Sequence, residues 1–223
     1  NMRKLQYIQA TKQELMLRNY SKSTIRSYTG CLFEYFDFKA KNVAEFDEKN
    51  IKDFLHFKIS KNLAPETVNL YLNAIKFFYR NVLKSRRKIS IKFARRALKL
   101  PVFLTHAEVL SIIECIFNKK HKLMISLAYG AGFRVSEVVN LKVRDLDFES
   151  KLIFIRNAKG AKDRVTILPE KLSEQLYYSS RLAKPDDYVF ESMRGGKLTA
   201  RTIQKVFKNA LWVSGIKKKA SFH

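Results

Sequence analysis

A long stretch without acidic residues divides this chain into two parts. Between Lys76 and Lys99 the sequence has ten lysines or arginines and no aspartate or glutamate, and Pro101 follows. Such a change of composition, closed by a proline, is typical of a linker between domains. We therefore predict a first domain over residues 1–83, a basic interdomain linker over residues 84–101 and a second domain over residues 102–223.

The first domain is predicted to be helical throughout. Its apolar residues recur at helical spacing, and signals for the start of a helix precede the successive groups. Ser21 or Ser23 can cap a second helix, Asp47 can cap a third, and Pro65 fits the first turn of a fourth. Four helices with short polar connections indicate a small all-α bundle.

The second domain mixes helices with a short β-rich region. Thr105–Glu108 has the form of a capping box, and an almost wholly apolar helix is expected around residues 123–129. Two β-rich stretches, residues 152–156 and 164–168, flank a turn that is typical of a hairpin. Further helices are expected after two more start signals, Pro169 and Thr199. The predicted fold class is therefore mainly α with a small β-hairpin or sheet.

The charge balance points to a polyanionic partner. The chain has 44 lysines and arginines against 20 aspartates and glutamates, a formal net charge of +24. Such an excess favours DNA or RNA first and an anionic membrane surface second. The alternative is a basic surface that water alone solvates.

Other functional classes find little support in the sequence. The chain has two cysteines without a CxxC pair and four scattered histidines, so we expect no zinc site and no other metal or cofactor. No apolar run reaches transmembrane length, and the N-terminus does not read as a signal peptide. We expect a cytoplasmic protein with no membrane partner.

Arg134 is the first candidate for phosphate chemistry. It follows a glycine turn at Gly132 and lies at or near the start of a helix, where a planar fork of donors can hold an anion. Glu137, one turn later, can orient the guanidinium through a charge-assisted hydrogen bond. The alternative is an ordinary surface ion pair between neighbours on a helix, which stabilises little.

Lysines at the tip of the expected hairpin are the second candidates. A mobile ammonium at Lys159 could reach into a groove and give a proton to a leaving oxygen. Lys162 and Arg164 would then bind the nucleic-acid backbone. The alternative is a basic turn exposed to solvent, and His223, the last residue, would by itself carry no meaning.

Taken in order, these segments resemble the tyrosine recombinase (phage integrase) family. The resemblance covers nearly the whole chain and runs through these segments: Ser21–Tyr28, Pro65–Tyr79, Leu100–Glu108, Ala131–Val138, Ala158–Arg164 and Ser221–His223. It implies a helical core-binding (SAM-like) domain followed by an α+β tyrosine-recombinase catalytic domain that is incomplete at its C-terminus. Among its members the chain looks most like a simple Xer-like recombinase.

The resemblance implies a site-specific recombinase that cuts DNA through a 3′-phosphotyrosyl intermediate, without ATP or metal. Arg134 would bind the non-bridging oxygens, Lys159 would protonate the 5′-oxygen, and His223 would assist proton transfer or bind the phosphate. Glu137 would support Arg134. The residues assigned to DNA binding are Lys22, Arg26, Arg80, Arg86, Arg87, Arg95, Arg96, Lys162, Arg164 and Arg201.

One part of the family pattern is expected to lie beyond this chain. The second arginine, a further histidine or tryptophan and the nucleophilic tyrosine would all follow His223. We therefore expect a chain that binds double-stranded DNA without cutting it and is a monomer off DNA, whereas the full-length protein would act as a homotetramer on paired sites. A non-catalytic DNA-binding accessory protein of the same fold and a basic helical RNA-binding protein are the alternatives.

Overall fold

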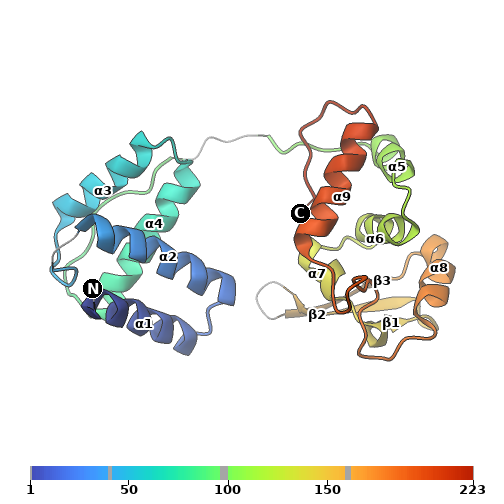
Figure 1. Cartoon of the computed structure of the whole chain (residues 1–223), viewed down its shortest axis with the longest axis horizontal. Helices are drawn as coiled ribbons and strands as arrows, with labels where there is room; N and C mark the ends of the chain where they lie inside the picture. Colours follow the sequence, from blue (N-terminus) through green and yellow to red (C-terminus); the bar gives the residue numbers. More distant parts are fainter. Residues whose placement is uncertain (1, 40–41, 96–99, 159–161, 223) are drawn as a thin grey trace. The chain divides into compact units, whose positions relative to one another are not determined.

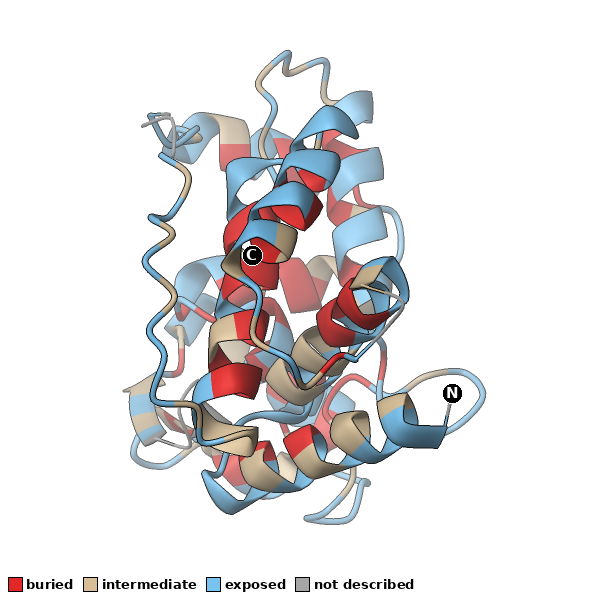
Figure 2. Ribbon diagram, turned by 90° about the vertical axis from the view of Figure 1, so that its left-hand side faces the viewer, coloured by how far each residue is buried: buried red, intermediate tan, exposed pale blue. Residues whose placement is uncertain are grey.

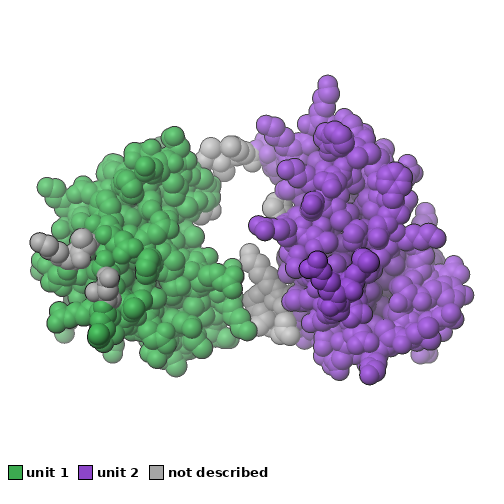
Figure 3. All heavy atoms as spheres, in the orientation of Figure 1, with its two compact units in different colours: residues 1–99 green, residues 100–223 purple. Residues whose placement is uncertain are grey.

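The computed structural model describes residues 2–39, 42–95, 100–158 and 162–222, except for the side chains of residues 157, 158 and 162. Its chain divides into two compact units, which we call unit 1 (residues 1–99) and unit 2 (residues 100–223) (Figure 3). Their boundary falls near the end of the predicted linker. Most of that linker therefore groups with unit 1.

Unit 1 is a helical bundle, as the sequence predicts. Its elements are α1 (Met2–Leu17), α2 (Lys22–Lys39), α3 (Glu48–Ser60), α4 (Pro65–Phe77) and the π-helical turn η1 (Phe78–Val82) (Figure 1). The predicted start signals are confirmed: the Ser21 hydroxyl accepts a hydrogen bond from the N–H of Thr24 at 3.1 Å, and Asp47 caps α3. Pro65 occupies the first turn of α4.

The buried residues of unit 1 lie on the inward faces of its helices (Figure 2), and aromatic side chains from α2, α3, α4 and η1 form a large part of this core. Tyr35, Phe36, Phe78 and Tyr79 are each at most 1% exposed. The Tyr79 hydroxyl lies 3.2 Å from that of Tyr35 and within 3.1 Å of two backbone carbonyl oxygens between α2 and α3. A buried phenol is therefore compatible with this core because its polar end has partners.

Residues 85–95 form an extended strap on unit 1. The amide side chain of Asn69 exchanges two hydrogen bonds with the backbone of Ala94, at 3.0 and 2.7 Å. The Lys76 ammonium donates to the carbonyl of Ile91 at 2.9 Å and lies 4.7 Å from the centre of the Phe93 ring. The strap is thus fixed by side chains of α4, which the expectation of a simple linker did not include.

Removing the Asn69 side chain should release this strap. Asn69 is only 4% exposed, so Asn69→Ala would leave both the N–H and the carbonyl of Ala94 without their partner and lower the stability of unit 1 by about 1 to 2 kcal/mol. Limited trypsin digestion should then cut faster within residues 85–95. Asn73→Ala changes an exposed asparagine of the same helix and serves as the control. Equal digestion rates for the two variants would contradict this role of Asn69.

Unit 2 combines helices with a small antiparallel sheet, as predicted. Its elements are α5 (His106–Glu114), α6 (Lys119–Gly130), α7 (Val135–Asn140), the 3₁₀ turn η2 (Val143–Asp145), β1 (Leu146–Asp147), β2 (Leu152–Ala158), β3 (Lys162–Ile167), α8 (Glu170–Ser180) and α9 (Ala200–Val213) (Figure 1). The strand order is β1-β2-β3. The two-residue strand β1 was not predicted because it is too short to show an alternating pattern.

The helix α6 lies at the centre of unit 2, as its apolar composition predicts. Met124 and Leu127 are fully buried, and α6 contacts α5, α7, α8 and α9. Thr105 closes the predicted capping box with Glu108, and Thr199 caps α9. No helix in the described part of the chain is long and apolar enough to cross a membrane.

Candidate phosphate-binding site

The turn between α6 and α7 places Arg134 at the surface of unit 2. Helix α6 ends at Gly130, and Gly132 takes a φ of +64°, a left-handed conformation that glycine adopts without steric cost. Phe133 is buried, and Arg134 follows as the N-cap residue of α7 with extended backbone angles. The turn therefore buries the phenylalanine and leaves the next side chain facing outward.

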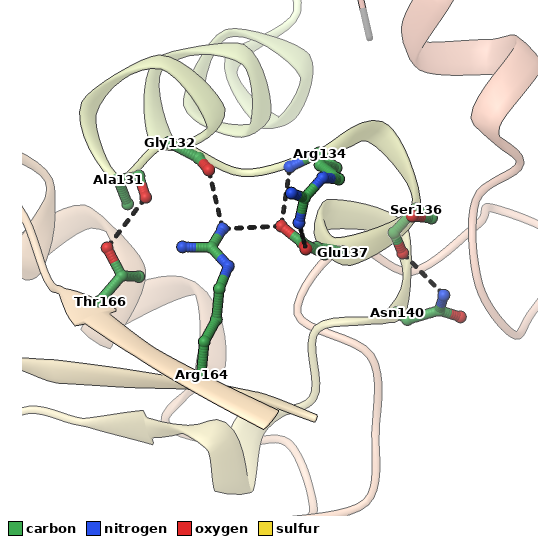
Figure 4. Close-up of polar contacts among 8 residues, drawn as sticks. All are labelled: Ala131, Gly132, Arg134, Ser136, Glu137, Asn140, Arg164 and Thr166. Carbon is green, nitrogen blue, oxygen red and sulfur yellow. Dashed lines mark hydrogen bonds and ion pairs between the residues drawn. The ribbon is translucent and has the colours of Figure 1, made fainter. Parts of the chain in front are cut away.

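A buried carboxylate fixes one edge of the Arg134 guanidinium (Figure 4). The two oxygens of Glu137 accept hydrogen bonds from the backbone N–H and from Nη1 of Arg134, each at 2.8 Å. The Glu137 side chain is 3% exposed, whereas that of Arg134 is 55% exposed. One edge of the guanidinium is thus bound by protein, while the rest of the group is open to an external phosphate.

A second arginine binds the same carboxylate. Nη2 of Arg164 on β3 donates to Oε2 of Glu137 at 2.7 Å and to the carbonyl oxygen of Gly132 at 2.8 Å (Figure 4). Two residues further along β3, the Thr166 hydroxyl donates to the carbonyl of Ala131 at 2.9 Å. Strand β3 is therefore attached directly to the turn that carries Arg134.

The two arginines control the charge of Glu137. Burial alone would raise the pKa of this carboxyl group, but hydrogen bonds from Arg164, from the N–H of Arg134 and from its guanidinium outweigh burial. The pKa of Glu137 is held below its ordinary value. Glu137 therefore remains ionised at neutral pH and keeps both arginines oriented.

The sequence identified part of this site. Arg134 and Glu137 were predicted as a pair, and the structure brings them together with Arg164. We assigned Arg164 to the DNA backbone, and that contact stays a prediction, although one of its nitrogens already binds protein groups. Thr166 was missed, and the signal that could have found it is its position two residues from Arg164 on an expected strand.

Several predicted residues of unit 2 lie outside the described part. Lys159 and His223 are among the residues that the structure does not describe, and the side chain of Lys162, at the start of β3, is not described either. Arg201 is exposed in the first turn of α9. Their predicted roles remain predictions.

The basic residues predicted to bind DNA from unit 1 are exposed wherever they are described. Lys22 and Arg26 lie on α2, and Arg80 lies in the π-helical turn. Along the strap the exposed arginines are Arg86, Arg87 and Arg95, whereas Arg96 falls outside the described residues. Their exposure leaves these side chains available to a polyanion, and their contacts with DNA stay predictions.

The fold and this site define a chain of the tyrosine recombinase class. The profile of the phage integrase family matches residues 102–223, and that of the N-terminal SAM-like domain of phage integrases matches residues 7–89. The chain belongs to the phage integrase, or tyrosine recombinase, family.

A curated relative supports this assignment, and a solved structure shares the fold. The chain is 32% identical over 212 residues to tyrosine recombinase XerA of Pyrococcus furiosus, covering 91% of this chain and 72% of XerA. It is 28% identical over 192 residues to a putative integrase/recombinase of Sinorhizobium fredii, covering 84% of this chain and 62% of that protein. The fold is similar to a lambda integrase tetramer bound to a Holliday junction, with a TM-score of 0.76, 16% identity and coverage of 98% of this chain and 69% of that chain.

Proposed function

We propose that this chain supplies the DNA-binding core of a site-specific recombinase that cleaves and rejoins DNA strands. The observation that carries the proposal is the open guanidinium of Arg134, which a buried glutamate holds in place within the catalytic domain of a recombinase family. A fixed arginine with free donors is suited to a phosphodiester, whose charge rises in the transition state.

The proposed reaction uses a tyrosine of a longer protein. The chain spans 62% of the Sinorhizobium relative and 72% of XerA, so a nucleophile outside it is compatible with both lengths. The tyrosine oxygen attacks the phosphorus as its proton passes to a base or to water, and the bond between phosphorus and the 5′-oxygen breaks. Arg134 stabilises the negative charge on the non-bridging oxygens, Lys159 gives a proton to the 5′-oxygen, and His223 assists proton transfer or binds the phosphate. Attack by a 5′-hydroxyl reverses the step.

The proposed partner is double-stranded DNA, bound by the exposed arginines and lysines of both units. A lambda integrase of similar fold forms a tetramer on a Holliday junction, and XerH, at 21% identity, has been seen on its difH substrate. We propose a homotetramer on paired DNA sites for the full-length protein, a monomer off DNA for this chain, and a cytoplasmic location.

A nicked trapping substrate tests the proposal. The full-length protein is incubated with a duplex that lets the 5′-hydroxyl fragment diffuse away after cleavage, so that a covalent protein–DNA adduct accumulates. We expect an adduct through a tyrosine with the full-length protein and none with the 223-residue chain. Binding without any adduct from the full-length protein would overturn the enzymatic proposal and favour a non-catalytic DNA-binding protein. Preference for RNA over duplex DNA would overturn the recombinase proposal and the DNA-binding alternative alike.

The arginines of the predicted linker, three on the strap and Arg96 after it, should contribute to affinity without sequence preference. Replacing Arg86, Arg87, Arg95 and Arg96 with alanine is expected to weaken binding to every duplex. It should also reduce the slope of log K against log salt by about 1 for each phosphate that the protein no longer neutralises. Fluorescence anisotropy over a series of KCl concentrations measures both quantities. Lysine at the same four positions keeps the charge and should retain most of the slope. An unchanged slope in the alanine variant would mean that the strap does not touch phosphate.

A further inference from the structure

Two side chains of β3 bond to successive carbonyl groups of the turn that carries Arg134. Thr166 donates to the carbonyl of Ala131, and Arg164 donates to that of Gly132 (Figure 4). In the sheet register, Arg164 pairs with Ile155 and Thr166 with Ile153 of β2. Because side chains two residues apart share one face of a strand, both donors point to the same side of β3.

Hydrogen bonds, and not packing alone, hold this turn. Beyond its two chain neighbours, no atom lies within 4 Å of the position where a Cβ of Gly132 would be, so side-chain packing does not confine the turn on that side. Phe133 anchors the far end of the turn in the core, where it is 5% exposed. The N–H groups of Ala131 and Phe133 donate to the carbonyl groups of Leu127 and Ala128 at 2.9 Å, and the two bonds from β3 add a restraint on the carbonyl groups of Ala131 and Gly132.

The contacts continue from the turn to the guanidinium itself. Arg164 binds the same oxygen of Glu137 that accepts the Arg134 backbone N–H, while the other oxygen holds the Arg134 guanidinium. Since Glu137 is almost fully buried, its carboxylate has a single orientation set by these donors. A shift of Arg164 would therefore move the backbone and the guanidinium of Arg134 together.

We propose that Arg164 and Thr166 are positioning residues, which set the orientation of Arg134 toward the phosphate. This inference rests on the proposed strand cleavage. It differs from the role of a DNA backbone clamp, because the groups that Arg164 engages here belong to the protein. Misplacement of a phosphate-binding group by about 1 Å can cost as much as 10²-fold in rate, so two hydrogen bonds that fix a turn have a measurable effect.

Variants of Thr166 in the full-length protein provide the first test. Thr166→Val keeps the shape of the side chain and removes only the hydroxyl, so we expect the single-turnover rate of strand cleavage to fall about tenfold while the Kd for duplex DNA changes less than about twofold. Thr166→Ser restores a hydroxyl and should recover most of the rate. Val165→Ala is the control, because Val165 is exposed and lies on the other face of the strand. Equal cleavage by wild type and Thr166→Val would overturn the proposal.

Arg164→Lys separates positioning from DNA contact. One nitrogen of Arg164, Nη2, makes both bonds, and a lysine retains the charge but has a shorter side chain that does not place its ammonium at that position. Positioning predicts slower cleavage with an unchanged Kd and salt slope, whereas a backbone clamp predicts retained cleavage.

Amide hydrogen exchange in the 223-residue chain adds a readout without catalysis: the Arg134 N–H should exchange faster in Thr166→Val than in wild type. If wild type forms no adduct, the proposed function fails, and unchanged exchange would then overturn the positioning role as well.

Discussion

Replacing Arg134 with alanine in the full-length protein is expected to lower the rate of DNA strand cleavage by about 10²- to 10³-fold, the usual effect of removing one donor that stabilises transition-state charge. The affinity for duplex DNA should fall much less, because many other basic side chains also contact the backbone in the proposed complex. Single-turnover cleavage on the trapping substrate and anisotropy binding measure the two quantities separately.

The control for this variant removes an arginine of unit 2 from outside the site. Arg144 lies in η2, is 46% exposed and pairs with Asp186 at 2.8 Å. Arg144→Ala takes away the same charge and should leave cleavage within about twofold of wild type. If Arg134→Ala and Arg144→Ala reduced cleavage equally, Arg134 would act only through the general charge of the protein and not by holding the phosphate.

The sequence predicted the helices well because their start signals are local. Ser21, Asp47, Thr105 and Thr199 each cap a helix with a bond to a backbone N–H within three residues. Such a contact depends only on a few neighbouring residues, so it can be inferred without knowledge of the tertiary fold. The two-residue strand β1, by contrast, depends on its pairing with β2 and leaves no pattern in the sequence.

The site was predicted only as far as its contacts are local. Glu137 follows Arg134 by three residues, and this spacing places the two side chains together at the start of a helix. Arg164 lies 27 residues from Glu137, and Thr166 lies 35 residues from Ala131. Contacts over such separations arise from the packing of β3 against the α6–α7 turn, which the sequence alone does not specify.

The same limit explains why the strap was interpreted as a simple linker. Its many basic residues suggested a segment exposed to solvent or to phosphate, and the described arginines of the strap are indeed exposed. What holds the strap is a buried asparagine 25 residues away on α4, together with the ammonium of Lys76. Asn69 lies among buried apolar residues of α4, such as Val68 and Leu72. Because a buried polar side chain needs a hydrogen-bond partner, such a position in the sequence indicates a contact with another segment.

Glu137→Gln should destabilise unit 2 by about 2 to 3 kcal/mol at neutral pH, because hydrogen bonds to charged partners are stronger than neutral ones and a buried carboxylate here serves two arginines. Glutamine has nearly the same shape, but its amide nitrogen would face an arginine donor in place of an acceptor oxygen. Pulsed hydrogen exchange over a series of urea concentrations, read at the buried residues Met124 and Leu127 of α6, reports on the unfolding of unit 2. Glu149→Gln, at an exposed position after β1, is the matched control and should have little effect.

The pH dependence of this difference identifies its cause. The pKa of Glu137 in the folded chain lies below its ordinary value of 4.5, so its ionised form stabilises the fold above that pH. As the pH falls through the lowered pKa, the carboxyl group takes up a proton and becomes neutral like glutamine, and its contribution is lost. The stability difference between wild type and Glu137→Gln should therefore be constant near neutral pH and shrink below pH 4.5. A difference that is as large in strong acid as at neutral pH would show that glutamine disturbs the packing of unit 2 and that the charge of Glu137 does not hold the two arginines.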